Sequence, residues 1–408
     1  MPARSRLVAA TAALLAAALA GCVGTTPPVG TASAPATAQP ASPSPSQALG
    51  HGLTDQPMNA ADATAIDQAM TERWQAAAPN APALYVGIWD PKRGYFTKAY
   101  GETRPGTAAT LDDFFRIGSI TKSFTATVVL RLVDQGTVTL TDTIRKAAPK
   151  VAAAYPSVAD RTVGQLLGMR SGIPDYANNP KSVIVRTAAK EPSHVFTADE
   201  LIKGGLRFGL KPAGKKTDYS TTNYILLQLM TEEITGKPLA QQIAEGVTGP
   251  LGMTSSTLPP DDDTTLPDPK SYSALTPSCQ GEFKASGATV KLGTDLTDWS
   301  ASYGQGGGGM TGTVRDLAIW AASGSGDELL AKQTVATRNT FTLMSGLEYG
   351  LGKLKIGDWV GHEGEAFGWE TLAVNNPKSG AVAVFAINSC GVLLPILGML
   401  DSAFPAGG

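Results

Sequence analysis

The sequence has little of what metal centres and nucleic-acid interfaces require. Its three histidines, His51, His194 and His362, do not cluster with one another or with cysteines at ligand spacing, so no metal site is expected. The formal net charge is −2 and no Lys/Arg run occurs, which gives no electrostatic reason to expect nucleic acid as a partner. With 42% hydrophobic and 17% charged residues, the 408-residue chain has an ordinary globular composition and enough apolar residues for a large core.

Two patterns that could hold a ligand are incomplete. Gly304, Gly306 and Gly309 match G-x-G-x-x-G, but the required strand–turn–helix unit and a later acidic residue are not evident. The acidic stretch LPPDDDTTLPDP lacks the alternating ligands, the glycine turn and the distal glutamate of a calcium loop. We therefore expect neither a metal nor an organic cofactor.

The N-terminal residues 1–22 predict export. Arg4 and Arg6 precede an apolar run over 7–20 that is too short to span a bilayer comfortably. It ends in Leu-Ala-Gly-Cys22, which resembles a bacterial lipoprotein cleavage box; a plain secretory signal with an incidental cysteine is the alternative. Residues 23–56, rich in Pro, Ala, Ser and Thr, predict a disordered tether. We expect the protein at the outer face of the bacterial cell membrane, anchored by a lipid on Cys22.

Two cysteines remain, Cys279 and Cys390. In an exported protein such a pair is a candidate disulfide, and two buried thiols are the alternative. Closing a loop of about 100 residues would stabilise the fold by up to roughly 4.7 kcal/mol on the chain-entropy model.

Strands are expected at both ends of the folded part, residues 57–405, with helices between them. The pattern predicts a helix over 60–74, strands over 83–90 and 95–102 around a turn, and a helix from 119 to Gly136. Thr313 and Asp316 cap a later helix, strands joined by turns follow over 358–389, and a last helix over 391–404 is expected to bend or break at Pro395.

Bringing the two ends together predicts an α+β fold, in which an antiparallel sheet is flanked by helices and carries an inserted, mainly helical domain. Residues 57–118 and 300–405 would form the α/β part, and 119–299 the helical part.

The segment FFRIGSITKSFTA carries the chemistry. Ser119 and Lys122 are three positions apart, and so lie on one side of a helical turn. At a helix N-terminus the backbone N–H groups suit a developing oxyanion, while the dipole and burial both lower the pKa of a lysine. An exposed polar helix entry is the alternative, since S-x-x-K alone is a weak pattern.

Further motifs add specificity. FRIGSITKSFTA, LLGMRSGIPDY, YSTTNYILLQLMTEEITGKPL, YGLG and GHEGEAFGW occur in this order over about residues 60 to 400. Together they resemble the serine hydrolase family of class C β-lactamases, penicillin-binding D-Ala-D-Ala carboxypeptidases and related esterases. The resemblance implies a β-lactamase/transpeptidase-like fold and an acyl-enzyme formed on a serine.

By this resemblance Ser119 is the nucleophile, Lys122 the activating amine and Tyr219 a phenolic base that later protonates the leaving group. The backbone N–H groups of Ser119 and Glu365 would form the oxyanion hole. Thr221, His362 and Gly364 would bind substrate. Because an unperturbed tyrosine has a pKa of about 10, we expect the positive charge of Lys122 to lower the pKa of Tyr219.

Three other residues compete for these roles. Tyr176 begins a literal Tyr-x-Asn, but Tyr219 precedes a helix, as the family motif does. Lys378 begins a literal Lys-Ser-Gly, but in an expected hairpin turn, whereas His362 begins an expected strand. His362 as the base of a Ser/His/Asp triad is disfavoured because no G-x-S-x-G surrounds Ser119.

The sequence departs from the family pattern at two positions. Thr221 replaces the asparagine of the second motif; Asn223 is a possible substitute. Glu363 replaces a hydroxyl residue that helps family members bind a substrate carboxylate, which a second carboxylate would repel.

We therefore expect a serine hydrolase acting on an amide or ester carbonyl, first as a D-Ala-D-Ala carboxypeptidase of the penicillin-binding type on a small or peptidoglycan-like substrate. Esterase and β-lactamase activities are the alternatives, and an inactive cell-wall-binding lipoprotein is the alternative of another class. The sequence does not indicate an oligomeric state.

Overall fold

The computed structural model describes residues 49–77, 81–179, 181–214, 217–260, 265–285, 287–344, 347–391 and 393–404. The expected signal peptide, the lipidation site Cys22 and the tether up to residue 48 lie outside these residues. Within the described ranges, no helix is long and apolar enough to cross a membrane.

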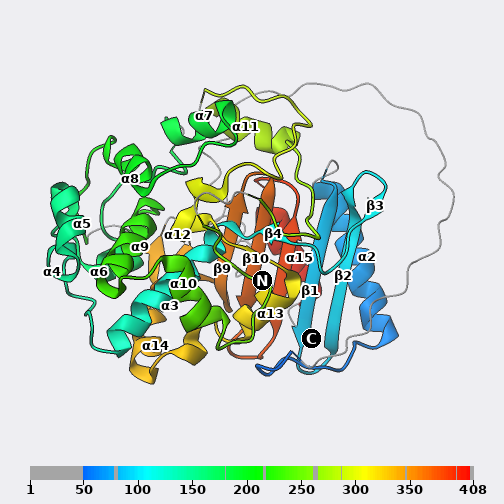
Figure 1. Cartoon of the computed structure of the whole chain (residues 1–408). Helices are drawn as coiled ribbons and strands as arrows, with labels where there is room; N and C mark the ends of the chain where they lie inside the picture. The colour runs from blue at the N-terminus through cyan, green and yellow to red at the C-terminus, as the bar shows by residue number, and fades with distance from the viewer. Residues whose placement is uncertain are drawn as a thin grey trace.

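One large antiparallel sheet dominates the structure (Figure 1). Among the described residues it contains nine strands in the order β3-β2-β1-β11-β10-β9-β8-β7-β6, so the N-terminal and C-terminal strands meet where β1 pairs with β11. The strands are β1 (Ala83–Asp90), β2 (Gly94–Arg104), β3 (Thr107–Ala108), β6 (Thr342–Met344), β7 (Leu347–Tyr349), β8 (Leu354–Ile356), β9 (Trp359–Ala366), β10 (Trp369–Asn375) and β11 (Val382–Ile387). A separate short pair joins β4 (Phe115–Arg116) to β5 (Thr311–Gly312).

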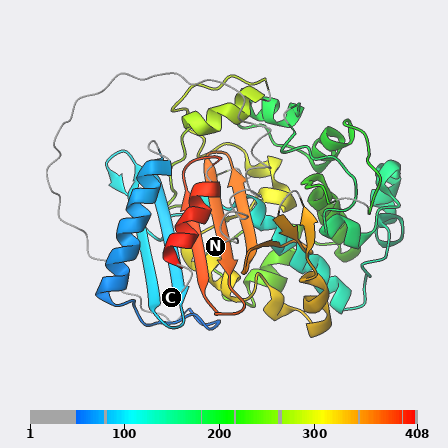
Figure 2. The ribbon, with the colours of Figure 1, turned by 180° about the vertical axis from the view of Figure 1, so that it is seen from behind.

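Both faces of the central strands are buried. Along β1, Leu84, Val86 and Ile88 face the helices α2 (Ala60–Ala77) and α15 (Leu393–Ala403), while Tyr85 and Trp89 face α13 (Val314–Ala322). This alternation is the period of two that a strand imposes on its side chains. Figure 2 shows α2 and α15 side by side across the rear of the sheet. The layers are therefore helix, sheet and helix.

Most of the remaining helices gather on the side of β9 that faces away from β1 and β2 (Figure 1). Helix α3 (Thr121–Asp134) joins the two parts, because its residues contribute to both the helical core and the core under α13. The others are α4 (Ile144–Ala147), α5 (Pro149–Ala154), α6 (Val163–Leu167), α7 (Val183–Lys190), α8 (Ala198–Leu206), α9 (Thr222–Thr235), α10 (Leu239–Ile243), α11 (Pro277–Ala285), α12 (Gln305–Gly308) and α14 (Lys332–Arg338).

The expected fold class is confirmed, and two details were wrong. Pro395 does not break α15, because it stands in the first turn of that helix, where a backbone N–H has no helical partner in any case. The disordered tether does not extend to residue 56. Leu49 and Leu53 pack against the core, and His51 hydrogen-bonds Glu328 at 2.8 Å and the Leu251 carbonyl at 3.1 Å.

Candidate active site

Ser119 lies in a single 3-10 turn, Gly118–Ile120, that leads directly into α3. Gly118 has φ +52°, a conformation that strains any residue with a side chain. Strand β9 comes so close to this turn that a Cβ at Gly364 would lie 2.0 Å from the Ile117 carbonyl oxygen. The two glycines thus let β9 and the turn Gly118–Ile120 come into contact. Ser119 keeps part of its surface exposed.

Lys122 stands one turn further into α3 and is completely buried. Its Nζ donates to the Ser119 hydroxyl at 2.9 Å and to the Gly307 carbonyl at 2.6 Å. Gly307 belongs to α12, and a Cβ there would lie 2.5 Å from the methyl group of Thr221. The glycine run that resembled a nucleotide motif therefore allows a close backbone approach, which brings a carbonyl oxygen to the lysine.

Burial lowers the pKa of Lys122 to about 8. The carboxylates of Asp175 and Glu363 act in the opposite direction and raise it. A lysine with this pKa is partly a neutral amine near neutral pH, and a neutral amine hydrogen-bonded to a serine hydroxyl can accept its proton.

Tyr219, the first residue of the segment YSTTNYILLQLMTEEITGKPL, lies next to Ser119 and Lys122. Lys122 Nζ lies 4.9 Å from the centre of its ring. The phenol hydroxyl is buried with no partner of normal hydrogen-bond geometry among the described residues, although the Ser119 hydroxyl is near enough to lower its pKa. Burial and the charge of Glu363 outweigh that contribution and hold the pKa of Tyr219 well above 10. The expected lowering of the pKa of Tyr219 by Lys122 is therefore wrong in direction, and the phenol stays protonated near neutral pH.

His362 is buried on β9, beside Glu363 and Tyr349. Its side chain is 1% exposed, and its Nδ1 contacts the Glu363 carbonyl oxygen at 2.6 Å. Because a carbonyl oxygen only accepts, Nδ1 carries the proton and Nε2 accepts from the Tyr349 hydroxyl at 3.2 Å. Burial and Lys122 lower the pKa of His362 to about 3, so the ring is neutral. Both ring nitrogens are thus engaged within the protein, and a direct contact of His362 with substrate stays a prediction.

Two carboxylates lie near Lys122 and Tyr219. Glu363 and Asp175 both act electrostatically on Lys122 and on Tyr219. Asp175 accepts from the backbone N–H groups of Ala177 at 2.9 Å and Thr221 at 3.1 Å. Sequence reasoning missed Asp175 and Tyr349, although the motifs SGIPDY and YGLG that contain them were recognised.

The competing residues have other partners. The Tyr176 hydroxyl donates to the Tyr303 carbonyl at 2.6 Å. Lys378 lies in the exposed β10–β11 turn and pairs with Asp358 at 2.7 Å. Asn223 accepts from Ser171 at 2.6 Å and donates to the Leu166 carbonyl, so it does not replace the missing second-motif asparagine. The Gly307 carbonyl is the second acceptor of Lys122 instead.

The backbone donors proposed for an oxyanion lie together. A Cβ at Gly118 would be 2.5 Å from the Glu365 nitrogen, so the Glu365 amide is next to the peptide that carries the Ser119 N–H. Their role remains a prediction. Thr221 is only 4% exposed, and Gly364 lies against the backbone of Ile117.

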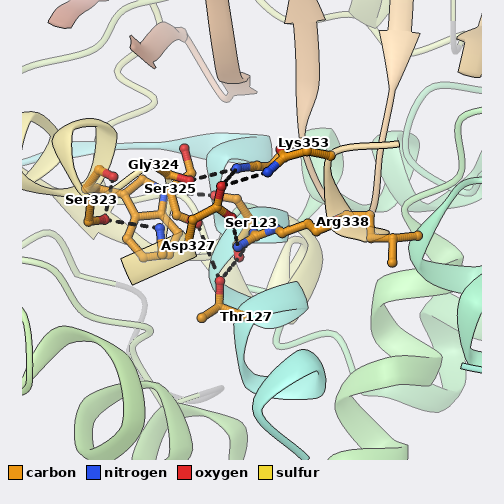
Figure 3. A network of polar contacts seen from close by, with 12 residues as sticks. Ser123, Thr127, Ser323, Gly324, Ser325, Asp327, Arg338 and Lys353 are labelled. Atoms are coloured by element: carbon orange, nitrogen blue, oxygen red, sulfur yellow. Dashed lines mark hydrogen bonds and ion pairs between the residues drawn. The ribbon is translucent and has the colours of Figure 1, made fainter. Parts of the chain in front are cut away.

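A buried polar network holds the first turn of α3 from behind (Figure 3). Arg338 donates to the Ser123 carbonyl at 3.1 Å, and Asp327 pairs with both Arg338 at 3.3 Å and Lys353 at 2.7 Å. Lys353 also donates to the Gly324 carbonyl at 2.7 Å. The network ties the helix of Ser119 and Lys122 to α14 and to the chain between β7 and β8.

Cys279 and Cys390 are joined by a disulfide. The bridge links α11 to the end of β11 within a small cluster that includes Phe283 and Trp299. Within the described part of the chain, no group of three or more His, Cys, Asp or Glu side chains could hold a metal ion.

Comparisons with known proteins identify relatives of the chain. The family model described as Beta-lactamase matches residues 64–392. The D-alanyl-D-alanine-carboxypeptidase/endopeptidase AmpH of Escherichia coli K12 is 35% identical over 172 residues, 41% of this chain and 43% of that protein. Penicillin-binding protein 4 of Amycolatopsis lactamdurans is 25% identical over 304 residues, 69% of this chain and 74% of that protein. The match thus spans less than half the length of the first curated relatives.

A solved structure extends the likeness to the whole domain. The D-stereospecific amidohydrolase of a Streptomyces species aligns with a TM-score of 0.70 at 25% identity, over 84% of this chain and 99% of that one.

Proposed function

Because the chain belongs to the beta-lactamase family of serine hydrolases, we propose that it hydrolyses amide bonds of D-alanyl peptides through an acyl-enzyme on Ser119. The observation that carries the proposal is the 2.9 Å hydrogen bond between the buried Lys122 amine and the Ser119 hydroxyl. AmpH, a D-alanyl-D-alanine-carboxypeptidase/endopeptidase, supports the substrate class.

The proposed acylation uses three side chains. The neutral amine of Lys122 takes the hydroxyl proton as Ser119 Oγ bonds to the carbonyl carbon. The C–N bond then breaks, the leaving nitrogen takes the phenol proton of Tyr219, and the Lys122 ammonium restores that proton to the phenol. The backbone N–H groups of Ser119 and Glu365 would stabilise the oxyanion.

Deacylation returns the enzyme to its starting state. Water adds to the acyl carbon and passes one proton to the Lys122 amine. The bond from the acyl carbon to Ser119 Oγ breaks, and Oγ takes that proton back. The products are the carboxylic acid and free Ser119.

Covalent labelling tests the proposal. We expect a fluorescent fluorophosphonate to add one adduct mass to the protein and peptide mapping to place it on Ser119, with no adduct on Ser119→Ala. D-Ala-D-Ala peptides should be hydrolysed by the wild type only. An adduct without turnover of any D-alanyl amide would favour the esterase alternative, and no adduct with any probe would favour the inactive cell-wall-binding alternative. β-Lactamase activity additionally requires fast deacylation of a chromogenic cephalosporin.

The pH dependence should report Lys122. Its pKa is lowered to about 8, and only its neutral form is a base. We therefore expect the rate of Ser119 labelling to rise about tenfold per pH unit below pH 8 and to level off above it. The phenol adds no limb in this range, because the pKa of Tyr219 is raised well above 10. A flat profile between pH 6 and 9 would contradict the assignment of Lys122 as the base.

Location at the outer face of the cell membrane, through a lipid on Cys22, also stays a proposal. We expect metabolic labelling with an alkynyl fatty acid to tag the wild type and not Cys22→Ala. Export without the tag would favour the plain secretory signal.

A further inference from the structure

Strand β9, next to the turn of Ser119, carries a carboxylate that the proposed reaction does not use. Glu363 stands on β9 between His362 and Gly364, and Gly364 is the residue that touches the backbone before Ser119. The side chain of Glu363 is 20% exposed. Glu363 is therefore close to Ser119, near enough to act electrostatically on Lys122 and Tyr219, and is partly exposed to solvent.

Glu363 has no cationic partner of its own in the described part of the chain. The His362 ring lies close to it, with Nδ1 4.0 Å from Glu363 Oε1, and that ring is neutral. Lys122 is the cation that interacts with Glu363, and Lys122 is already hydrogen-bonded to Ser119 and Gly307. Burial raises the pKa of Glu363, while the positive charge of Lys122 acts in the opposite direction and favours the carboxylate. Asp175 adds a second negative charge acting on Lys122. A carboxylate held like this repels an anion bound beside Ser119 and attracts a cation.

We propose that Glu363 determines substrate specificity by charge. The site at Ser119 disfavours substrates with a free carboxylate next to the scissile bond and prefers substrates with a neutral or positively charged group at that position. This inference rests on the proposed function and narrows it. Among D-alanyl amides it favours internal peptide bonds, primary amides and amine-bearing leaving groups over a C-terminal D-Ala-D-Ala.

A charge series tests the inference. Three amides of N-acetyl-D-alanine differ in the leaving group: D-alanine carries a carboxylate, D-alaninamide is neutral, and ethylenediamine carries one ammonium group. We expect kcat/KM of the wild type to be about 10- to 100-fold lower for the first than for the other two. A second pair, D-alaninamide and its N-acetyl derivative, places the charge on the acyl side.

Two variants and one control isolate the charge. Glu363→Gln keeps the shape and Glu363→Thr restores a hydroxyl; both should bring the carboxylate substrate to within about threefold of the neutral one. Asp358→Asn removes an exposed charge at the start of β9, whose side chain is 56% exposed and paired with Lys378, and should leave every ratio unchanged. Glu363→Gln should also shift the ascending limb of the pH profile to lower pH, because it removes a charge that raises the pKa of Lys122.

The outcomes separate this inference from the proposed function. If the phosphonate labels Ser119 but neither substrate series responds to charge, or Glu363→Gln leaves the ratios and the pH profile unchanged, the inference fails and the hydrolase assignment stands. If Ser119 is never labelled and no substrate turns over, the proposed function fails. Calorimetric binding of the three amides to Ser119→Ala then decides the charge preference alone: equal affinities overturn it, and weaker binding of the carboxylate supports it.

Discussion

Replacing Lys122 by methionine should slow phosphonate labelling of Ser119 by about 10³- to 10⁴-fold, the upper range for removing a positioned general base. The amine donates to Ser119 at 2.9 Å and no other lysine in the described part of the chain contacts that hydroxyl. Intact mass spectrometry measures the labelling rate of the wild type after rapid mixing and that of Lys122→Met after long incubation.

Loss of folding would not account for this result. Lys122 is completely buried and its pKa is lowered, so burial of its charge opposes folding, and a methionine of similar length removes that cost. Lys122→Met should therefore unfold at the same or a higher denaturant concentration. Lys355→Met, a half-buried lysine of β8 paired with Glu348, is the matched control and should label at the wild-type rate. Labelling of Lys122→Met within tenfold of the wild type would rule out the lysine as the base.

Replacing Asp327 by asparagine should lower the free energy of unfolding by about 3 kcal/mol, near the lower end of the range for breaking a buried ion pair. The Asp327 carboxylate is the acceptor shared by Arg338 and Lys353, whose side chains are 0% and 1% exposed (Figure 3). The side chain of Asp327 itself is 19% exposed, which is why we expect the lower value. Denaturant-induced unfolding measures the difference.

Lys353 offers a test of why Asp327→Asn should be less stable than the wild type. In Asp327→Asn the buried guanidinium of Arg338 and the amine of Lys353 lose the carboxylate that they share, so the double variant Asp327→Asn/Lys353→Met should be more stable than the single variant. Burial and Arg338 lower the pKa of Lys353 to about 7 because its charge is costly at this position, and loss of Asp327 should lower that pKa further. If the double variant were less stable than the single one, the loss would come from packing and not from unpaired charge.

Much of the secondary structure followed from local patterns. The strand 83–90 was predicted with its exact observed limits, because ALYVGIWD is bounded by a Pro-Lys-Arg-Gly turn that closes a hairpin. The helix after Ser119 ends near Gly136, as its spacing of apolar residues indicated. Pro395 was misjudged because a proline in the first turn of a helix and one in its middle look alike until the start of the helix is known.

The candidate site was only partly predictable. Motif order and spacing were enough to select Ser119, Lys122 and Tyr219, and to prefer them over Tyr176 and Lys378. The second acceptor of Lys122, the carbonyl of Gly307, could not be found, since a backbone oxygen leaves no residue-specific signal in the sequence. The direction of the Tyr219 pKa was also missed, because the burial and the charge of Glu363 that raise it depend on tertiary packing.

By itself the amino-acid sequence determined the order of helices and strands and the family, and it singled out Ser119 as the candidate nucleophile, since these depend on periodicity and on short runs of neighbouring residues. Only the tertiary structure decided which groups meet. The turn of Ser119, the second-motif tyrosine, the glycines of α12 and strand β9 are far apart in the chain, and their contact arises from packing between the sheet and the helical part. Burial in that contact also set the protonation of Lys122, Tyr219 and His362, because the cost of desolvating a charge exists only once the chain has folded around it.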